Sequence, residues 1–486
     1  MTSALSNMGR QGLSSRHQPP SDFVEPDELR TSFALAMSQM YRNEVPLYGD
    51  LIRIVQDVNH SVITAQGRDG AVRSSAELER LTLERHGAIR LGTPEELLTV
   101  KRIFALLGMQ AVGYYDLSVA GLPMHATCFR PVSTISLARN PFRVFTTLLR
   151  PELVQSDNAR DLALQLLEKR QIFSQDLLRI LDVAETQNLR LTSDQAATLI
   201  REALYTFSWK PVAAATYAEY QILRAEHPIL ADIACFNSAH INHLTPRTLD
   251  IGAAQIAMQK EDMDTKDRIE GPPIRACPIL LRQTSFLALE EAIRFKTDDA
   301  GERLTSGSHK ARFGEIEERG AAVTPAGRDL YDRLFSEAMS AARGLSPEAA
   351  DAILAKAFQR YPDTWKELRQ RELVYCEYRC TGKALSPSLE SGEISESLVE
   401  RLVEQGVLEA VPITYEDFLP FSAAGIFQSN LKGNAPKAKL EQEVPQPCPD
   451  LPGMEKALGG SVLDPDDLYS TAQRESLISC ARKLRA

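Results

Sequence analysis

The chain is predicted to pass twice through the same order of elements, strand-helix-strand-strand-strand, and this repetition constrains its fold most strongly. The first copy opens with a strand at Glu84–Arg90. Its helix starts after Thr93, where a proline at the first helical position and a glutamate at the third complete a capping box. Apolar and β-branched runs then predict three strands. They cover Gln110–Leu117, Met124–Pro131 and Phe142–Leu149.

The second copy begins with a predicted strand at His240–Pro246 and continues with a helix over Asp250–Asp262. Three further strands are predicted at Ile274–Ser285, Leu289–Lys296 and Arg312–Val323. The two copies share their order of elements and not their residues. Two such units, each a sheet with its own helix, predict an α+β fold built from two βαβββ modules.

The remaining residues divide around the two modules. Residues 1–26 are rich in Ser, Gln, Pro and Gly and lack an apolar segment, which is typical of a disordered lead-in and not of a secretion signal. Between the modules, apolar residues at helical spacing predict a helical insert. The predicted divisions are 1–26 (lead-in), 27–150 (helical cap and first module), 151–234 (helical insert), 235–344 (second module), 345–440 (mixed α/β region) and 441–486 (tail).

Charge and composition narrow the classes of function. The 486 residues include 55 Lys and Arg against 65 Asp and Glu, a formal net charge of −10. A net-acidic chain argues against nucleic acid or an anionic membrane as the main partner, because both favour clustered basic residues. No uncharged apolar stretch reaches the roughly 18 residues of a membrane helix. The seven cysteines form no CxxC pair, which indicates reduced thiols in a cytoplasmic protein.

The first module places a histidine and an arginine on one strand. His86 and Arg90 are four residues apart, so on a regular strand they share a face and lie about 13 Å apart along the backbone. A metal ligand at one position and a long cationic side chain at the other could hold the two ends of one small diacid. The alternative is a half-buried histidine beside a surface arginine.

The second module offers two histidines and two glutamates. His240 and His243 are odd-spaced, so on a regular strand they point to opposite faces and cannot both bind one metal unless the strand bulges. Glu315 and Glu317 share a face, and such a carboxylate pair is normally solvated. One histidine from each module and one of these glutamates would make a two-histidine, one-carboxylate set. That set suits non-haem Fe(II) and oxygen chemistry.

Five long runs resemble a known family. They look like the 2-oxoadipate dioxygenase/decarboxylase family, whose members are also called 2-hydroxyglutarate synthases or YdcJ-like proteins, and the resemblance extends over residues 27–440. More distantly, FGEIEERG is similar to the strand that bears the iron-binding glutamate of 4-hydroxyphenylpyruvate dioxygenase, a vicinal-oxygen-chelate fold of βαβββ modules. The runs are ERHGAIRLGT (Glu84–Thr93), GYYDLSVAGLPMHATCFRP (Gly113–Pro131), HINHLTPRTLD (His240–Asp250), RFGEIEERGAAVTPAGRDLYD (Arg312–Asp332) and DFLPFSAAGIFQSNL (Asp417–Leu431).

The resemblance implies a role for individual residues. It implies metal ligands at His86 and Glu315, and a second histidine ligand within HINHLTPR, where His243 is favoured and His240 is the alternative. The two histidine ligands would also contact the substrate. The implied substrate-binding residues beyond them are Arg90, Phe421 and Ser422. Phe421 departs from the family, which has a smaller aliphatic residue there.

The activity implied by the resemblance is an Fe(2+)-dependent conversion of 2-oxoadipate and O2 to 2-hydroxyglutarate and CO2, in lysine catabolism. The mixed region 345–440 would then complete the substrate pocket. Two other classes remain open at this point. One is a non-redox, metal-dependent isomerase or lyase on the same fold, and the other is a non-catalytic binding protein.

Overall fold

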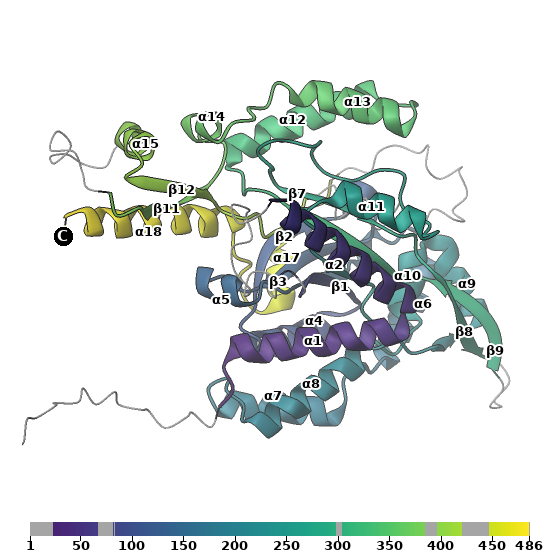
Figure 1. Ribbon diagram of the computed structural model, residues 1–486. Helices are drawn as coiled ribbons and strands as arrows, with labels where there is room; N and C mark the ends of the chain where they lie inside the picture. The colour runs from purple at the N-terminus through teal and green to yellow at the C-terminus, as the bar shows by residue number, and fades with distance from the viewer. Residues whose placement is uncertain are drawn as a thin grey trace, which may run out of the picture.

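A seven-stranded sheet runs through the centre of the computed structural model, which describes residues 23–66, 81, 83–297, 304–383, 396–419 and 447–485 (Figure 1). The strands lie in the order β2-β3-β4-β1-β6-β10-β7. Each predicted module therefore contributes its first strand to the middle of the sheet. The bounds are β1 Glu84–Leu91, β2 Gln110–Asp116, β3 Met124–Arg130, β4 Arg143–Leu149, β6 His243–Pro246, β7 Leu281–Ser285 and β10 Phe313–Arg319.

The first module has the predicted order of elements. Strand β1 pairs in parallel with β4, and β3 lies antiparallel between β4 and β2. Helix α4 (Pro94–Leu106) follows β1 directly. The Thr93 hydroxyl accepts the Glu96 N–H, and the Glu96 carboxylate in turn accepts the Gly92 N–H, so the predicted helix start is confirmed.

The second module repeats this arrangement on the other side of the sheet centre. Strand β6 pairs in parallel with β10, and β7 is antiparallel to β10. Helix α11 (Ile251–Lys260) connects β6 to the strands that follow. The two modules meet where β1 and β6 pair antiparallel. The predicted α+β fold, with two modules joined in one sheet, is confirmed.

The second module differs from the prediction in its later strands. The strand predicted at Leu289–Lys296 exists as β8 (Glu290–Lys296), but it leaves the main sheet and pairs with β5 (Val212–Thr216) and β9 (Leu304–Lys310). Strand β5 lies within residues predicted to be helical, and β9 was not predicted because its sequence is polar. Strand β7 starts only at Leu281, since the prolines at 272, 273 and 278 withhold the backbone donors that a ladder needs.

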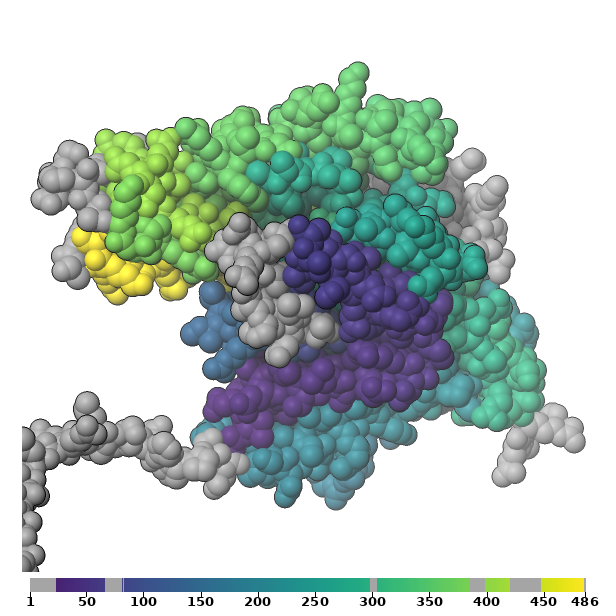
Figure 2. All heavy atoms as spheres, viewed as in Figure 1, coloured from purple at the N-terminus to yellow at the C-terminus, as the bar shows by residue number. Residues whose placement is uncertain are grey.

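Helices surround the main sheet. Helices α1 and α2 lie at the surface in Figure 2, with the teal residues of α11 beside α2, which α11 contacts. Among the described helices, none is both long enough and apolar enough to cross a lipid bilayer. The bounds up to the second module are α1 Pro26–Glu44, α2 Pro46–Gln66, α5 Thr134–Arg139, α6 Asp157–Lys169, α7 Gln175–Thr186, α8 Ser193–Phe207, α9 Tyr217–Glu226 and α10 Pro228–Ala234, with short 3₁₀ turns at Ser118–Ala120 and Pro151–Leu153.

The C-terminal region packs as a mixed α/β layer with its own apolar core. Strands β11 (Cys376–Cys380) and β12 (Leu408–Pro412) pair antiparallel. The segment 441–486, predicted as a tail, carries two helices where it is described; α18 packs along β11, and α17 contacts α4. The helices of this region are α12 Pro325–Ala341, α13 Pro347–Phe358, α14 Trp365–Gln370, α15 Glu396–Glu404, α17 Leu451–Leu458 and α18 Pro465–Arg485. Residues 1–22 of the predicted lead-in lie outside the described residues.

The two faces of the main sheet bury different side chains. On β1, Ile89 and Leu91 join an apolar core beneath α1, α2, α4 and α8. Ala88, which points the other way, joins a second core with residues of α9 and α10. A Cβ at Gly314 would lie 2.7 Å from Leu51 of α2, so glycine lets this helix pack directly on β10. The face of Ala88 is the face that carries the site described next.

Candidate metal centre

Three adjacent strands each bring one potential ligand to the centre of the sheet. His86 lies on β1, His243 on β6 and Glu315 on β10. In the antiparallel pair β1–β6, His86 lies opposite Thr245. In the parallel pair β6–β10, His243 lies opposite Phe313, so Glu315, two residues further on, falls level with Thr245 on the same face. Register alone thus assembles the group from both modules.

The three side chains form a compact, buried group. One ligand atom from each lies within 4.8 Å of the others. His86 Nε2 lies 3.0 Å and His243 Nε2 lies 4.0 Å from Glu315 Oε1. The two imidazole rings are 5.4 Å apart and perpendicular. The Thr245 hydroxyl lies among them, 3.1 Å from His86 Nε2 and 3.2 Å from Glu315 Oε1. Two imidazoles and one carboxylate that converge in this way match a facial triad for a divalent metal.

The chemistry of this group fits a metal ion. Among the described residues, Glu315 Oε2 and His243 Nδ1 are buried without a hydrogen-bond partner, which is costly unless a ligand satisfies the site. Burial lowers the pKa of His243 well below its usual range, and His86 and Arg90 add to the effect. The His243 imidazole is therefore neutral, which is the form that binds a metal. The group contains no thiolate, so it suits Fe(II)-like ions better than soft metals.

The second carboxylate of β10 supports the first histidine. Glu317 Oε2 lies 2.9 Å from His86 Nδ1, on the opposite edge of the ring from Glu315. Arg319 donates to both Glu317 oxygens, with distances of 2.8 Å and 2.7 Å. Burial alone would raise the pKa of Glu317, but Arg319 and His86 hold it well below its usual range. The expectation of a solvated glutamate pair is wrong, because both Glu315 and Glu317 are fully buried and Glu317 is paired with a cation.

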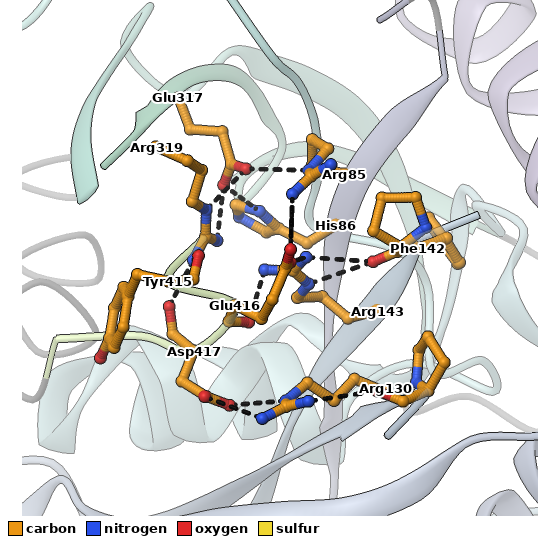
Figure 3. A network of polar contacts seen from close by, with 12 residues as sticks. Arg85, His86, Arg130, Phe142, Arg143, Glu317, Arg319, Tyr415, Glu416 and Asp417 are labelled. Carbon is orange, nitrogen blue, oxygen red and sulfur yellow. Dashed lines mark hydrogen bonds and ion pairs between the residues drawn. The ribbon is translucent and has the colours of Figure 1, made fainter. Parts of the chain in front are cut away.

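A buried ion network continues from Glu317 into the C-terminal region (Figure 3). Arg85 Nη2 lies 3.3 Å and 3.1 Å from the two carboxylate oxygens of Glu416. Arg143 pairs with the same carboxylate. Although burial opposes ionisation, Arg85 and Arg143 lower the pKa of Glu416 to about 2. Arg130 binds Asp417 through two bonds of 2.7 Å and 2.9 Å. The network thus fixes residues 416 and 417 beside the sheet.

The predicted substrate arginine lies on the same strand as His86 and is buried. Arg90 is 5% exposed, so the alternative of a surface arginine is wrong. Its Nη1 lies 2.5 Å from Asp232 Oδ2 on α10. The other Asp232 oxygen lies 2.8 Å from His309 Nε2 and 3.2 Å from His240 Nε2. Burial would raise the pKa of Asp232, but His240 and Arg90 hold it well below its usual range.

The two candidate histidines of HINHLTPR have separate surroundings. His243 is the first residue of β6 and faces Glu315. His240 precedes the strand, so strand alternation does not apply to it. It lies against Asp232, with the Trp209 ring 4.7 Å away at 87°. The structure brings His243, and not His240, together with His86 and Glu315.

The C-terminal segment reaches the same group through an aromatic ring. The Phe418 ring lies 4.8 Å from the His86 ring, at 90°. The Phe418 N–H donates to the Tyr115 hydroxyl at 3.1 Å. Phe421 and Ser422, which the resemblance implies as substrate contacts, lie outside the described residues.

Sequence reasoning misses two residues of this site and the burial of a third. Asp232 lies in a segment that only helical periodicity had characterised, and nothing near it in the chain indicates that it meets Arg90. Thr245 could have been found from its position two residues after His243 on the same face of a strand. Glu317 is one of the two candidate glutamates of the sequence analysis, but its burial is not predicted. The signal for that burial is Arg319, which follows two residues later on the same face of β10 and supplies the opposite charge.

Comparisons with known proteins identify the family of the chain. A sequence model of the family described as 2-oxoadipate dioxygenase/decarboxylase matches residues 33–430. A protein of that name from Pseudomonas putida is 46% identical over 472 residues, which cover 96% of this chain and 99% of the relative. One from Escherichia coli K12 is 45% identical over 461 residues, which cover 94% of this chain and 98% of the relative.

A solved structure from the same family has the same fold. The crystal structure of the Pseudomonas putida hydroxyglutarate synthase in complex with 2-oxoadipate superimposes with a TM-score of 0.82 at 44% sequence identity, and the match covers 96% of this chain and 100% of that chain. The match of sequence and structure extends over nearly the full length of both proteins. The chain belongs to the 2-oxoadipate dioxygenase/decarboxylase family.

Proposed function

We propose that the chain is an Fe(II)-dependent dioxygenase that converts 2-oxoadipate and O2 to 2-hydroxyglutarate and CO2, in lysine catabolism. The observation that carries the proposal is the buried group of His86, His243 and Glu315 with Arg90 on the same strand as His86. Relatives at 45% and 46% identity bear the name of this activity, and the solved relative from Pseudomonas putida was crystallised with 2-oxoadipate.

The metal would be held by one nitrogen of each histidine and by the Glu315 carboxylate. When bound, Fe(II) supplies the redox chemistry that O2 needs and a Lewis acid for the 2-oxo acid end of the substrate. The protein supplies the rest. His86 is held from its far side by Glu317, and Thr245 offers a hydroxyl among the three ligands. The apolar Phe418 ring, packed on His86, limits the access of water to the group.

Arg90 would bind the distal carboxylate of the substrate and so select a diacid. A guanidinium presents paired donors that match a carboxylate. The resemblance implies that Phe421 and Ser422 contact the substrate chain, and both lie beyond Leu419, the last described residue of that segment. Phe421 is larger than the aliphatic residue of the family, so we expect a narrower fit around the chain.

The free thiols support a cytoplasmic location for the proposed enzyme. Each of the seven cysteines lies in a described segment, and none forms a disulfide. A reducing compartment keeps buried thiols in this state, so we expect a cytoplasmic enzyme.

An oxygen-electrode assay tests the proposal. Protein reconstituted anaerobically with Fe(II) should consume one O2 per 2-oxoadipate and release CO2 and 2-hydroxyglutarate. A panel of 2-oxo diacids should show a clear optimum of chain length. Turnover of the substrate without O2 uptake would favour the isomerase or lyase alternative. Failure to retain stoichiometric metal after reconstitution would favour the binding protein.

A further inference from the structure

We propose that Glu317 is a positioning residue for His86, and that Arg319 links this carboxylate to residues 415–417, so that metal affinity depends on how the C-terminal segment is docked. The inference deepens the proposed function, because it rests on His86 as a metal ligand. It concerns residues that the resemblance does not assign.

The first link is the contact between Glu317 and the His86 ring. Glu315 Oε1 lies 3.0 Å from Nε2, and Glu317 Oε2 lies 2.9 Å from Nδ1. A neutral imidazole carries one proton, and a carboxylate attracts it to the nitrogen that it faces. Carboxylates face both ring nitrogens, but a metal held on the Nε2 side would leave Nδ1 as the nitrogen that carries the proton, and Glu317 is the carboxylate that faces it. Carboxylates in this position orient a ligand ring and raise its basicity.

The second link is the fork between Arg319 and Glu317. The guanidinium Nε lies 2.8 Å from Oε1, and Nη2 lies 2.7 Å from Oε2. Two parallel bonds fix the plane of the carboxylate as well as its charge. Arg85 Nε adds a longer contact of 3.5 Å to Oε1. Because Glu317 is held in this way, its oxygen toward His86 has little freedom to turn away.

The third link runs from Arg319 to the backbone. Its remaining nitrogen, Nη1, donates to the carbonyl oxygen of Tyr415 at 3.2 Å and to that of Asp417 at 2.5 Å. Figure 3 shows Arg319 between Glu317 on one side and Tyr415 and Asp417 on the other. Arg319 thus contacts both Glu317, which supports His86, and the backbone of Tyr415 and Asp417.

The segment is held independently at two further points. Glu416 pairs with Arg85 and Arg143, and Asp417 is bound by Arg130. Together these contacts leave Phe418 packed against the ring of His86. His86 is therefore contacted by Glu317 at Nδ1 and by the perpendicular Phe418 ring. Phe418 itself belongs to the segment 415–418, and Glu317 is linked to that segment through Arg319.

The composition of the network favours a positional role over a purely stabilising one. It buries four arginines and three carboxylates, and the desolvation of such ions offsets most of their attraction. Apolar residues of similar size would stabilise a fold at least as well. An ion network provides directional bonds, which here connect His86 to residues 415–417, whereas an apolar core provides none.

Glu317→Gln tests the first link in the full-length protein. Glutamine keeps the shape of the side chain but removes the charge that attracts the His86 proton. We expect the affinity for Fe(II) under anaerobic conditions, and for Co(II) as an optical probe, to fall about 10- to 100-fold in competition with a chelator. The Co(II) ligand-field spectrum should shift as well. The matched control is Glu318→Gln, since Glu318 points to the other face of β10 and pairs with Arg282 at 3.2 Å; its metal affinity should equal that of the wild type.

Arg319→Lys tests the rest of the chain of contacts. Lysine keeps the positive charge, but its single nitrogen cannot make the two parallel bonds to Glu317 and also reach both carbonyl oxygens. We expect weaker Co(II) binding, a higher KM for 2-oxoadipate and faster hydrogen exchange at residues 415–418. Should Glu317→Gln fail to fold, these three readouts still decide the proposal.

The outcomes separate this inference from the proposed function. Unchanged Fe(II) and Co(II) affinity in folded Glu317→Gln, or in Arg319→Lys, overturns the inference even if the wild type is fully active. Reduced affinity with no turnover of 2-oxoadipate by the metal-loaded wild type supports the inference and contradicts the proposed function instead.

Discussion

Arg90 Nη1 lies 2.5 Å from Asp232 Oδ2, and neither side chain is more than 5% exposed. The charge of the predicted substrate arginine is thus balanced by a residue of the protein. A substrate carboxylate that binds Arg90 must share the guanidinium with Asp232 or displace it. Arg90 and Asp232 together, and not Arg90 alone, therefore set how strongly a second carboxylate is bound.

Arg90→Lys separates substrate recognition from metal binding. Lysine cannot make a planar two-point contact, so we expect kcat/KM for 2-oxoadipate to fall by about 30- to 1000-fold, on the order of 2–4 kcal/mol, while metal content is unchanged. A 2-oxo monoacid of similar length should lose far less. Steady-state oxygen uptake with both substrates measures the difference. Equal losses for the two substrates would mean that Arg90 acts on the metal centre or on folding.

Asp232→Asn tests the balance of charge around Arg90. This variant removes the carboxylate that pairs with Arg90, His240 and His309 in the substrate-free protein, which we expect to destabilise the fold by roughly 3–5 kcal/mol. A bound diacid restores the missing charge. Under anaerobic conditions, 2-oxoadipate should therefore raise the Tm of metal-loaded Asp232→Asn by more than it raises that of the wild type.

The control for this variant is again the monoacid, which should give equal Tm shifts in both proteins. A smaller shift with the diacid in Asp232→Asn would show that Asp232 aims the guanidinium and does not compete with the substrate for it.

Single alanine variants identify the ligands. We expect His86→Ala, His243→Ala and Glu315→Ala each to lose most of their Fe(II) affinity and the rise in Tm that Fe(II) gives the wild type. His240→Ala should keep both, because His240 lies against Asp232 and not against Glu315. Metal analysis after anaerobic reconstitution measures this directly. Full iron content in His243→Ala with loss in His240→Ala would reverse the assignment.

The fold was predictable from sequence where local signals were strong. The first module follows the prediction closely, because Thr93 and Glu96 fix the start of its helix and buried strands read as continuous apolar runs. The second module was predicted in order but not in pairing. Strand β8 has the pattern of a strand, yet no pattern states which strand it pairs with, and it joins β5 outside the main sheet. Periodicity reports local conformation, whereas pairing depends on distant contacts.

The candidate site shows the same limit at the level of residues. Residue types and strand faces pointed to His86, a second histidine and one of two glutamates. The choice between Glu315 and Glu317 depends on register across β1, β6 and β10, which a single strand does not contain. Buried charge is harder still to predict. Asp232 meets Arg90 across 142 residues of chain, so neither burial nor pairing could be inferred from its neighbours.

Glu416 predicts how the fold responds to acid. Its pKa is lowered from 4.5 to about 2, so the folded state favours the ionised carboxylate. Its contribution is therefore complete above about pH 4.5 and is lost as the pH falls toward 2, and it amounts to on the order of 3 kcal/mol. We expect Glu416→Gln to be less stable than the wild type at pH 7, and the gap between the two to close as the pH approaches 2. Urea unfolding at a series of pH values measures this gap.

Exposed Glu409 on β12 supplies the control, since Glu409→Gln should track the wild type at every pH. A gap for Glu416→Gln that stays constant from pH 7 to pH 3 would mean that the Glu416 side chain stabilises the fold by packing, and that its ion pairs with Arg85 and Arg143 contribute nothing net.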